Sequence, residues 1–229
     1  MFNKRHIVRT IAATVSILAL SFTAACGSGQ STASNSTDSD DITQQTYKPG
    51  KLTIATGQPA YEPWVMNDKP ESGEGYEAAV AYAVADKLGF KKSDVVWTRT
   101  AFDTAIAPGA KDWDFNIQQF GITDERKKAV DFSSSYYNDS QSVVVKKDSK
   151  FANATKVSDL KDATVGVMVG TLAYDYAKAN IKDDIQTFND DAALAQALDA
   201  GQIDALVTST VECVYMVQSE QVKDAKVLG

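Results

Sequence analysis

Hydrophobic and polar positions alternate from residue 51 onward in a way that predicts short strands separated by helices. Short apolar runs rich in β-branched residues are typical of buried strands, whereas apolar residues spaced three and four apart indicate helices. We predict strands at 51–56, the first half of 114–126, 95–97, 141–147, 163–169, 185–188, 203–207 and 225–228. We predict helices at 75–89, 102–106, 123–130, 172–179, 190–200 and 210–219. Strands that alternate with helices imply parallel βαβ units, whose ligands bind at the carboxyl ends of the strands.

The helix predicted between Gly75 and Gly89 has the clearest pattern. Its apolar residues at helical spacing are expected to face the core: Tyr76, Ala79, Val80, Ala83, Val84 and Leu88. Gly89 is a suitable stop because glycine adopts the left-handed conformation that ends many helices. A second helix is predicted to be capped by Asn189 and to end at Gly201.

The N-terminus has the pattern of a secretory signal. Cationic residues precede an apolar run, residues 11–20, that is too short to cross a bilayer as a mature helix. Thr23-Ala24-Ala25-Cys26 follows and looks like the lipobox of a lipoprotein, although Thr23 stands where leucine is usual. We predict a signal peptide over 1–25 and lipidation of Cys26. The alternative is an ordinary Ala-x-Ala cleavage site beside an incidental cysteine.

Residues 26–48 predict a tether between the lipid and the folded part. Residues 27–45 are almost all Ser, Thr, Asn, Asp, Gln and Gly, which bury too little apolar surface to fold. Two acyl chains on Cys26 would supply the two signals that stable anchoring needs. We therefore expect the protein on the extracytoplasmic face of the cell membrane, anchored through Cys26.

Charge and the rare residues exclude several classes of function. The net charge is −7, and removing the three cations of residues 1–25 leaves 20 cations against 30 acids, or −10. Such a charge argues against nucleic acid as a partner. The one histidine, His6, lies in the signal peptide, so His-dependent catalysis and His metal sites are excluded from the mature chain. We predict no cofactor and no metal, and Cys213 as a buried small hydrophobe.

The segment 114–126 has the most informative chemistry. It predicts a short buried strand, a turn through Gly121 and a helix that starts at Thr123, whose hydroxyl can cap the first N–H groups. Arg126 then falls in the first helical turn, where a cation opposes the helix dipole. A carboxylate would be the natural partner for this guanidinium because two N–H groups can bind two oxygens. A solvated Arg126, or one paired with Asp124, is the alternative.

The order and spacing of motifs from residue 51 onward are similar to those of the amino-acid-binding proteins of ABC importers, the family-3 solute-binding proteins. Thr123-Asp124-Glu125-Arg126 and Asp131-Phe132-Ser133-Ser134-Ser135-Tyr136-Tyr137 carry the resemblance. It implies an α/β fold of the type II periplasmic-binding-protein kind, with two lobes, mostly parallel sheets, flanking helices and hinge strands. Lobe 1 would span 49–142 and lobe 2 would span 143–229. The protein would be a monomeric, non-enzymatic binding component that delivers an amino acid or small carboxylate to a permease.

The resemblance also implies a ligand site. Arg126 would bind the ligand carboxylate, helped by backbone N–H groups near Gly121 and at the Gly170-Thr171 turn. Tyr61 and Phe102 would enclose the apolar part of the ligand. Trp64, Gln118 and Gln119 would line the slot, and Ser209 lies where many members of the family hold the ligand ammonium with aspartate.

Three positions depart from the family pattern. Gly121 replaces a hydroxyl residue, Ser209 replaces the aspartate, and Gly57-Gln58 occupies a place where an acid can occur. A buried ammonium without a carboxylate is unfavourable. Another acid could serve, with Glu62, Glu77 and Asp103 as candidates, or the ligand is not a standard amino acid.

Two alternatives to an amino-acid binder follow from these departures. A dehydratase-like enzyme on the same fold would need Glu62 or Glu77 as its general acid or base. A module without ligand recognition is the other alternative. Family members also return to lobe 1 through a second hinge strand, and this chain ends at Gly229 where that return would begin, so the sequence suggests a fragment or a naturally shortened copy.

Overall fold

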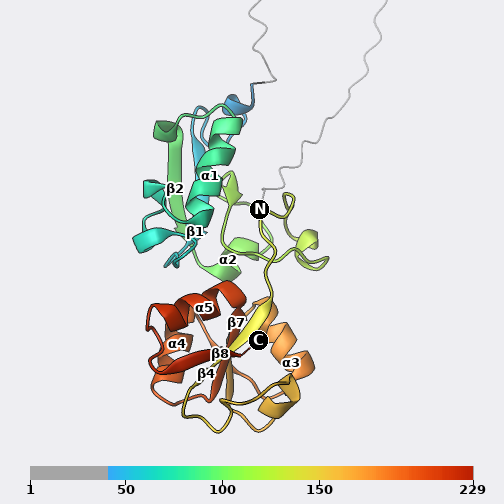
Figure 1. Cartoon of the computed structure of the whole chain (residues 1–229). Coiled ribbons are helices and arrows are strands. Elements are labelled where there is room, and N and C mark those ends of the chain that lie inside the picture. Colours follow the sequence, from blue (N-terminus) through green and yellow to red (C-terminus); the bar gives the residue numbers. More distant parts are fainter. Residues whose placement is uncertain (1–40, 229) are drawn as a thin grey trace, which may run out of the picture.

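A computed structural model describes residues 41–228 (Figure 1). The helices are α1 (Tyr76–Lys87), α2 (Phe102–Ile106), α3 (Leu172–Asn180), α4 (Asp191–Asp199) and α5 (Thr210–Gln218). The strands are β1 (Leu52–Gly57), β2 (Val95–Thr100), β3 (Phe115–Asn116), β4 (Gln141–Lys146), β5 (Val165–Met168), β6 (Gln186–Phe188), β7 (Ala205–Ser209) and β8 (Ala225–Leu228). Short 3₁₀ segments lie at Ile42–Gln44, Met66–Asp68, Pro70–Ser72, Lys92–Asp94, Arg126–Lys128 and Val157–Leu160.

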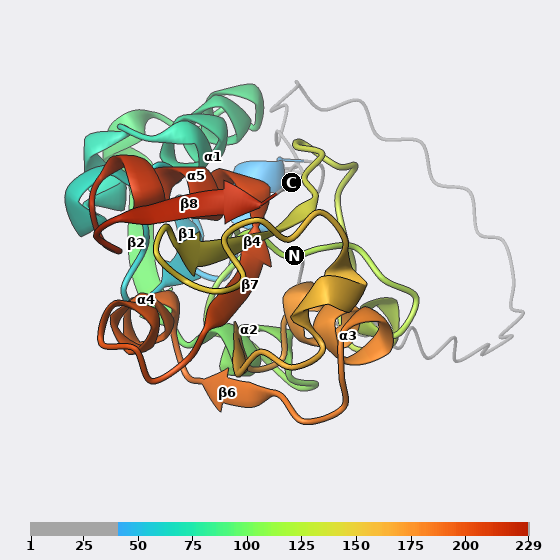
Figure 2. The same cartoon turned by 60° about the horizontal axis from the view of Figure 1, so that its bottom comes forward.

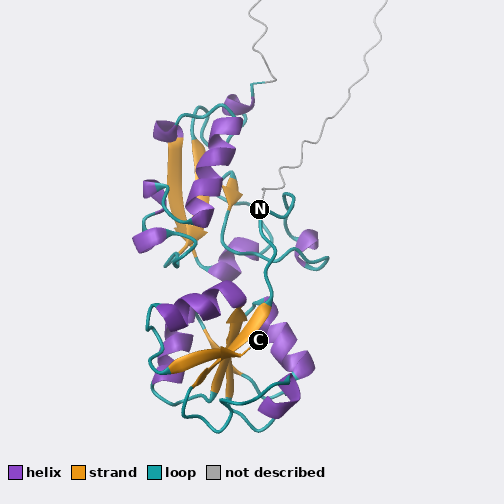
Figure 3. Ribbon diagram, viewed as in Figure 1, coloured by secondary structure: helices purple, strands orange, loops and turns teal. Residues whose placement is uncertain are grey.

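The strands form two separate sheets, which confirms the predicted two-lobed α/β fold (Figure 3). The first sheet has the order β2-β1-β3 and is parallel, with Ile54 of β1 paired to both Trp97 and Phe115. The second sheet has the order β6-β5-β7-β4-β8; β5, β6 and β7 are parallel, and β4 runs antiparallel to both of its neighbours. Because β4 pairs with β7 from Gln141 onward, it belongs to the second sheet along its whole length.

Successive residues of a strand point to opposite faces of the sheet, and apolar residues occupy both faces, so each sheet has two buried faces. In the second sheet, Val143 and Val145 pack with α3, whereas Val144 packs with α4 and α5. Figures 1 and 2 show α3 on one side of the sheet and α4 on the other. Cys213 of α5 is fully buried, and burial raises the pKa of its thiol to about 12. The prediction that Cys213 is a small buried hydrophobe is confirmed.

The predicted inward face of α1 is wrong in part. Tyr76, Ala79 and Ala83 are exposed, and the buried residues of α1 are Glu77, Ala78, Ala81 and Ala85. Periodicity alone favoured larger apolar side chains, but the alanines Ala81 and Ala85 pack against β1 and β3 in the core. Gly75 allows the start of α1 to lie against the loop after β1, because its φ is +100° and a Cβ there would lie 2.5 Å from the carbonyl oxygen of Trp64.

Two local predictions need correction. The helix expected at 123–130 is only a 3₁₀ turn, Arg126–Lys128. Within that segment only Val130 is buried, so packing supplies too little free energy for a longer helix. The cap of α4 is Asp190, whose carboxylate accepts the Ala193 N–H at 2.8 Å, and not Asn189.

No helix between residues 41 and 228 is long and apolar enough to cross a membrane. The signal peptide predicted over 1–25, Cys26 and most of the predicted tether lie outside the described residues.

Candidate functional site

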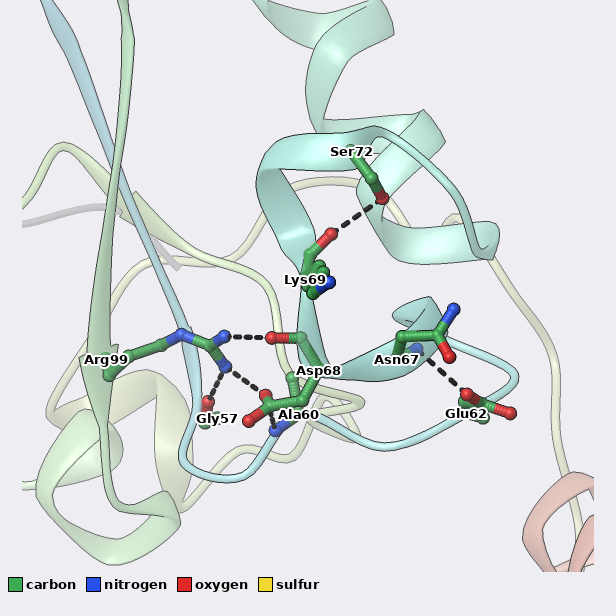
Figure 4. A network of polar contacts seen from close by, with 8 residues as sticks. All are labelled: Gly57, Ala60, Glu62, Asn67, Asp68, Lys69, Ser72 and Arg99. Carbon is green, nitrogen blue, oxygen red and sulfur yellow. Dashed lines mark hydrogen bonds and ion pairs between the residues drawn. The ribbon is translucent and has the colours of Figure 1, made fainter.

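The loop after β1 is fixed by one arginine on the neighbouring strand. Arg99 of β2 donates hydrogen bonds to the Gly57 carbonyl (2.8 Å) and to the side chain and backbone carbonyl of Asp68 (both 2.6 Å) (Figure 4). Asp68 in turn accepts the Ala60 N–H at 2.8 Å. These bonds hold the turn that presents Tyr61.

A buried carboxylate fixes the second loop of the site. Glu77, in the first turn of α1, is fully buried and accepts hydrogen bonds from the Gln119 N–H (2.8 Å), the Gln119 side chain and the Tyr136 hydroxyl. Gln119 has a φ of +51°, a conformation that non-glycine residues rarely adopt. Glu77 therefore stabilises an unfavourable turn at the end of β3.

Arg126 lies beside a stacked pair of aromatic rings. Phe102 and Phe120 stack with their centroids 4.0 Å apart, and the guanidinium lies 5.7 and 5.5 Å from the two centroids. The guanidinium donates to the carbonyls of Gly121 and Gly170, each at 2.9 Å. The Thr123 hydroxyl accepts the Arg126 N–H at 3.1 Å, so its predicted capping role is present although the helix is not. Burial lowers the pKa of Arg126 without removing its charge.

A cavity of about 430 Å³ lies between the two sheets, a volume within the usual range for small-molecule sites. It opens at the carboxyl ends of parallel strands, where Gly57, Asn116, Met168 and Ser209 line it. The cavity also brings together nine of the ten residues predicted for the ligand site: Tyr61, Trp64, Phe102, Gln118, Gln119, Gly121, Arg126, Thr171 and Ser209.

The tenth residue, Gly170, does not line the cavity, and the anion-binding turn expected at Gly170-Thr171 has a different arrangement. The carbonyls of Gly170 and Gly121, rather than their N–H groups, face Arg126. The Thr171 hydroxyl accepts the Tyr174 N–H at 3.3 Å and donates to the Met168 carbonyl at 2.7 Å. The Thr171 hydroxyl therefore caps α3, and anion binding by the N–H groups of this turn stays a prediction.

A steric contact explains why residue 121 is a glycine. A Cβ at this position would lie 2.3 Å from a terminal methyl carbon of Leu172, which belongs to the opposite lobe. The lobes approach each other here closely enough that a hydroxyl residue would displace Leu172. The loss of the hydroxyl at Gly121 thus accompanies a tight contact between the lobes.

The acids proposed from the sequence as partners for a ligand ammonium are not in the cavity. Glu62, Glu77 and Asp103 are all absent from its lining. Glu62 accepts hydrogen bonds from the Tyr215 hydroxyl and the Asn67 N–H, and these bonds lower the pKa of its carboxyl. Asp103 is exposed. The same geometry removes Glu62 and Glu77 as a general acid or base that contacts a substrate in this cavity.

Two buried acids of the cavity wall escaped the sequence analysis. Asp191 at the start of α4 and Glu212 in the first turn of α5 both line the cavity and are buried. The spacing Ser209-x-x-Glu212 is the sequence signature of a capping box, and it could have drawn attention to Glu212.

Within residues 41–228, hydrogen bonds connect the two lobes. Arg126 donates to Gly170, and the Tyr215 hydroxyl of α5 donates to Glu62 in the loop after β1. Figure 1 shows α5 at the top of the second lobe, facing the first. Together with the Gly121 and Leu172 contact, these bonds describe a closed arrangement of the lobes around the cavity.

The fold and the cavity together define a class of protein. It is a two-lobed α/β protein whose lobes enclose a small-molecule cavity, and an arginine, buried acids and aromatic side chains line that cavity. Comparison with known proteins gives the family. Residues 52–197 match the bacterial extracellular solute-binding proteins, family 3, and the chain belongs to this family.

Individual relatives agree with this assignment. The glutamine-binding protein of Geobacillus stearothermophilus is 32% identical over 225 residues, which cover 90% of this chain and 82% of the relative. The L-cystine-binding protein TcyJ of Escherichia coli K12 is 31% identical over 160 residues, covering 69% of this chain and 59% of the relative. The match thus spans about three fifths of that relative's length.

A solved structure with the same fold is the ancestral amino acid-binding protein AncCDT-1, a precursor of cyclohexadienyl dehydratase. It matches with a TM-score of 0.67 and 31% identity, over 79% of this chain and 77% of the other. This neighbour shows that the fold described here is the fold of an amino-acid-binding protein.

Proposed function

We propose that this chain is the extracytoplasmic substrate-binding component of an ABC importer and that it binds an amino acid or a related small carboxylate. The observation that carries the proposal is the position of Arg126. It is the one Lys or Arg among the described residues that line the cavity, and it lies at the contact between the lobes. The hydrogen bonds of its guanidinium to Gly121 and Gly170 use two of its five N–H donors, which leaves donors for a carboxylate.

The relatives support this class of ligand. Proteins similar to this chain bind glutamine and cystine, both α-amino acids. In this chain, Arg126 binds the carboxylate, Phe102 and Tyr61 contact the apolar part, and Trp64, Gln118, Gln119, Gly121, Thr171 and Ser209 complete the wall. The lobes close over the ligand by rotation about the segment that joins the sheets. The loaded protein then docks on a permease.

A ligand screen tests the proposal. Thermal unfolding of the chain with each of the twenty amino acids, and with small carboxylates that lack an amine, should show stabilisation by one ligand class. At a ligand concentration 100 times the dissociation constant, the gain in free energy of unfolding is about 2.7 kcal/mol. Cooperative unfolding without stabilisation by any of these compounds would contradict the proposal and favour a module that has lost its ligand.

A dehydratase-like activity is the second candidate, favoured by the relationship of AncCDT-1 to a dehydratase. The general acid or base that the sequence offered for it does not reach the cavity. Burial raises the pKa of Glu77 to about 7, as an acid–base role would require, but Gln119 and Tyr136 occupy the carboxylate. The geometry therefore supports binding better than catalysis.

We further propose that a lipid on Cys26 anchors the protein. The support is the lipobox-like sequence that ends at Cys26 and the polar tether after it. Cys26→Ser is expected to move the protein from the detergent phase to the aqueous phase in a detergent partition assay. The matched control, Cys213→Ala, changes the other cysteine and should leave the partition unchanged. A Cys26→Ser variant that stays in the detergent phase would contradict lipid anchoring.

A further inference from the structure

Asp191 and Glu212 are an unusual feature of the cavity wall because both are acids and both are almost inaccessible to solvent. Their exposed fractions are 6% and 8%. They come from different helices of the second lobe, at the starts of α4 and α5, yet they lie close enough that the charge of Glu212 raises the pKa of Asp191. Burying two neighbouring carboxyls costs folding free energy unless a cation or a proton compensates them.

The surrounding contacts satisfy these acids incompletely. Thr208 donates its hydroxyl proton to Glu212 at 2.8 Å, and the Ser209 hydroxyl accepts the Glu212 N–H at 3.2 Å. Trp64, from the first lobe, also lies beside the Glu212 carboxyl. In contrast, atom Oδ1 of Asp191 is buried and has no hydrogen-bond partner among the described residues. A buried acceptor of this kind points to a donor that the ligand supplies.

We propose that Asp191 and Glu212 form a subsite for the cationic nitrogen of the ligand whose carboxylate binds Arg126. This inference rests on the proposed function and specifies its ligand as a carboxylate that also carries an ammonium group. Ser209 cannot balance that charge because its hydroxyl is neutral. Glu212 lies one turn further along α5, and its carboxylate lies beside the hydroxyl of Ser209. Glu212 thus places a negative charge next to the position where Ser209 has none.

Charge balance supports the assignment. Arg126 is the one cation lining the described cavity, and Asp139, Asp191 and Glu212 are its acids. A carboxylate on the ligand neutralises Arg126 and leaves the acids uncompensated. An ammonium on the same ligand then finds the opposite charge in the second lobe, so both lobes contact the ligand and closure becomes favourable.

Binding should also release protons. Burial and the neighbouring charges of Glu212 and Asp190 raise the pKa of Asp191, while burial and the charge of Asp139 raise the pKa of Glu212. The other titratable groups that face the pair are Glu77, Tyr61 and Cys213. Both carboxyls therefore hold their protons to a higher pH than free carboxyls do, and an ammonium, which favours their charged form, should displace a proton.

Titration calorimetry tests the inference on the full chain. The probes are the amino acid that binds most tightly in the screen of twenty and its 2-hydroxy acid, in which a hydroxyl replaces the ammonium. Measurements at pH 7 in buffers with different ionisation enthalpies count the protons released. We expect proton release on binding of the amino acid, and affinity for the hydroxy acid that is weaker by about 30-fold or more.

Three variants complete the test. Asp191→Asn and Glu212→Gln should each weaken amino-acid binding by about 30-fold or more and reduce proton release. Asp184→Asn is the matched control because Asp184 is exposed in the same lobe and does not line the cavity. Thermal unfolding verifies that each variant folds, and removal of a buried carboxylate should leave the melting temperature equal or higher.

The outcomes separate the two proposals. If the hydroxy acid binds as tightly as the amino acid, or if both variants retain the affinity of the parent, the ammonium subsite is wrong and the carboxylate-binding function stands. If the parent chain binds only carboxylates that lack an amine, the ammonium subsite is wrong, and if it binds none of the amino acids and none of the small carboxylates, the proposed function itself is wrong.

Discussion

Arg126→Ala is expected to weaken ligand binding by about 100-fold or more. The ligand carboxylate would lose its partner, and no other Lys or Arg among the described residues lines the cavity. Truncating one member of a buried, hydrogen-bonded charge pair typically costs about 2–5 kcal/mol of binding free energy. The affinity of the parent and the variant for the best ligand of the screen, measured by calorimetry, gives the ratio directly.

Lys127→Ala is the matched control for this experiment. Lys127 is the next residue in the chain, carries the same charge, is exposed and pairs with Asp124 at 3.1 Å. Its removal should change the affinity less than twofold, roughly the range for a screened surface charge. Equal losses in both variants would indicate a general effect of net charge, and an unchanged affinity in Arg126→Ala would show that the carboxylate binds elsewhere.

Arg126→Ala should have a smaller effect on the fold. The guanidinium packs on Phe102 and Phe120 and joins the lobes through Gly170. A cation near an aromatic ring contributes about 0.5–1 kcal/mol at a partly exposed site. We therefore expect a modest decrease in melting temperature with cooperative unfolding retained, which keeps the binding result interpretable.

Glu77→Gln is expected to abolish most of a pH dependence of stability between about pH 5 and 7. Burial raises the pKa of Glu77 from 4.5 to about 7 in the folded state. The folded protein thus holds this proton more tightly than the unfolded chain. The contribution of Glu77 to the free energy of unfolding is then fully present below pH 4.5 and is lost as the pH rises through 7. A shift of this size corresponds to about 3 kcal/mol.

Chemical denaturation at pH 5 and pH 7.5 measures this difference. Glutamine has the shape of protonated glutamate and can still accept hydrogen bonds from the Gln119 N–H and the Tyr136 hydroxyl. The variant should equal the parent at pH 5 and exceed it at pH 7.5. Asp191 and Glu212 shift in the same direction, so the difference between parent and variant isolates Glu77.

Glu74→Gln is the control because Glu74 is an exposed glutamate three residues earlier. It should leave the difference between the two pH values unchanged. A Glu77→Gln variant with the same pH dependence as the parent would show that the Glu77 carboxyl keeps an ordinary pKa.

The resemblance to a known family predicted the two lobes. The sequence patterns by themselves predicted the order of strands and helices and the position of the cavity at the strand ends. These features depend on short apolar runs, caps and turns, whose signals lie within a few residues of each other. Residues 102–106 illustrate this, since the helix predicted there has the same limits as α2. The ordered motifs around Arg126 likewise directed attention to nine residues that line the cavity.

The tertiary structure decided which polar groups are buried. Glu77 is buried because Gln119 and Tyr136, more than 40 residues away, supply its donors. Asp191 and Glu212 meet because α4 and α5 pack on the same face of one sheet. The segment 123–130 has the local signals of a helix start, but it lacks the packing partners that a helix needs. Burial of a charge depends on groups brought together from distant parts of the chain, and no local pattern of residues encodes that distance.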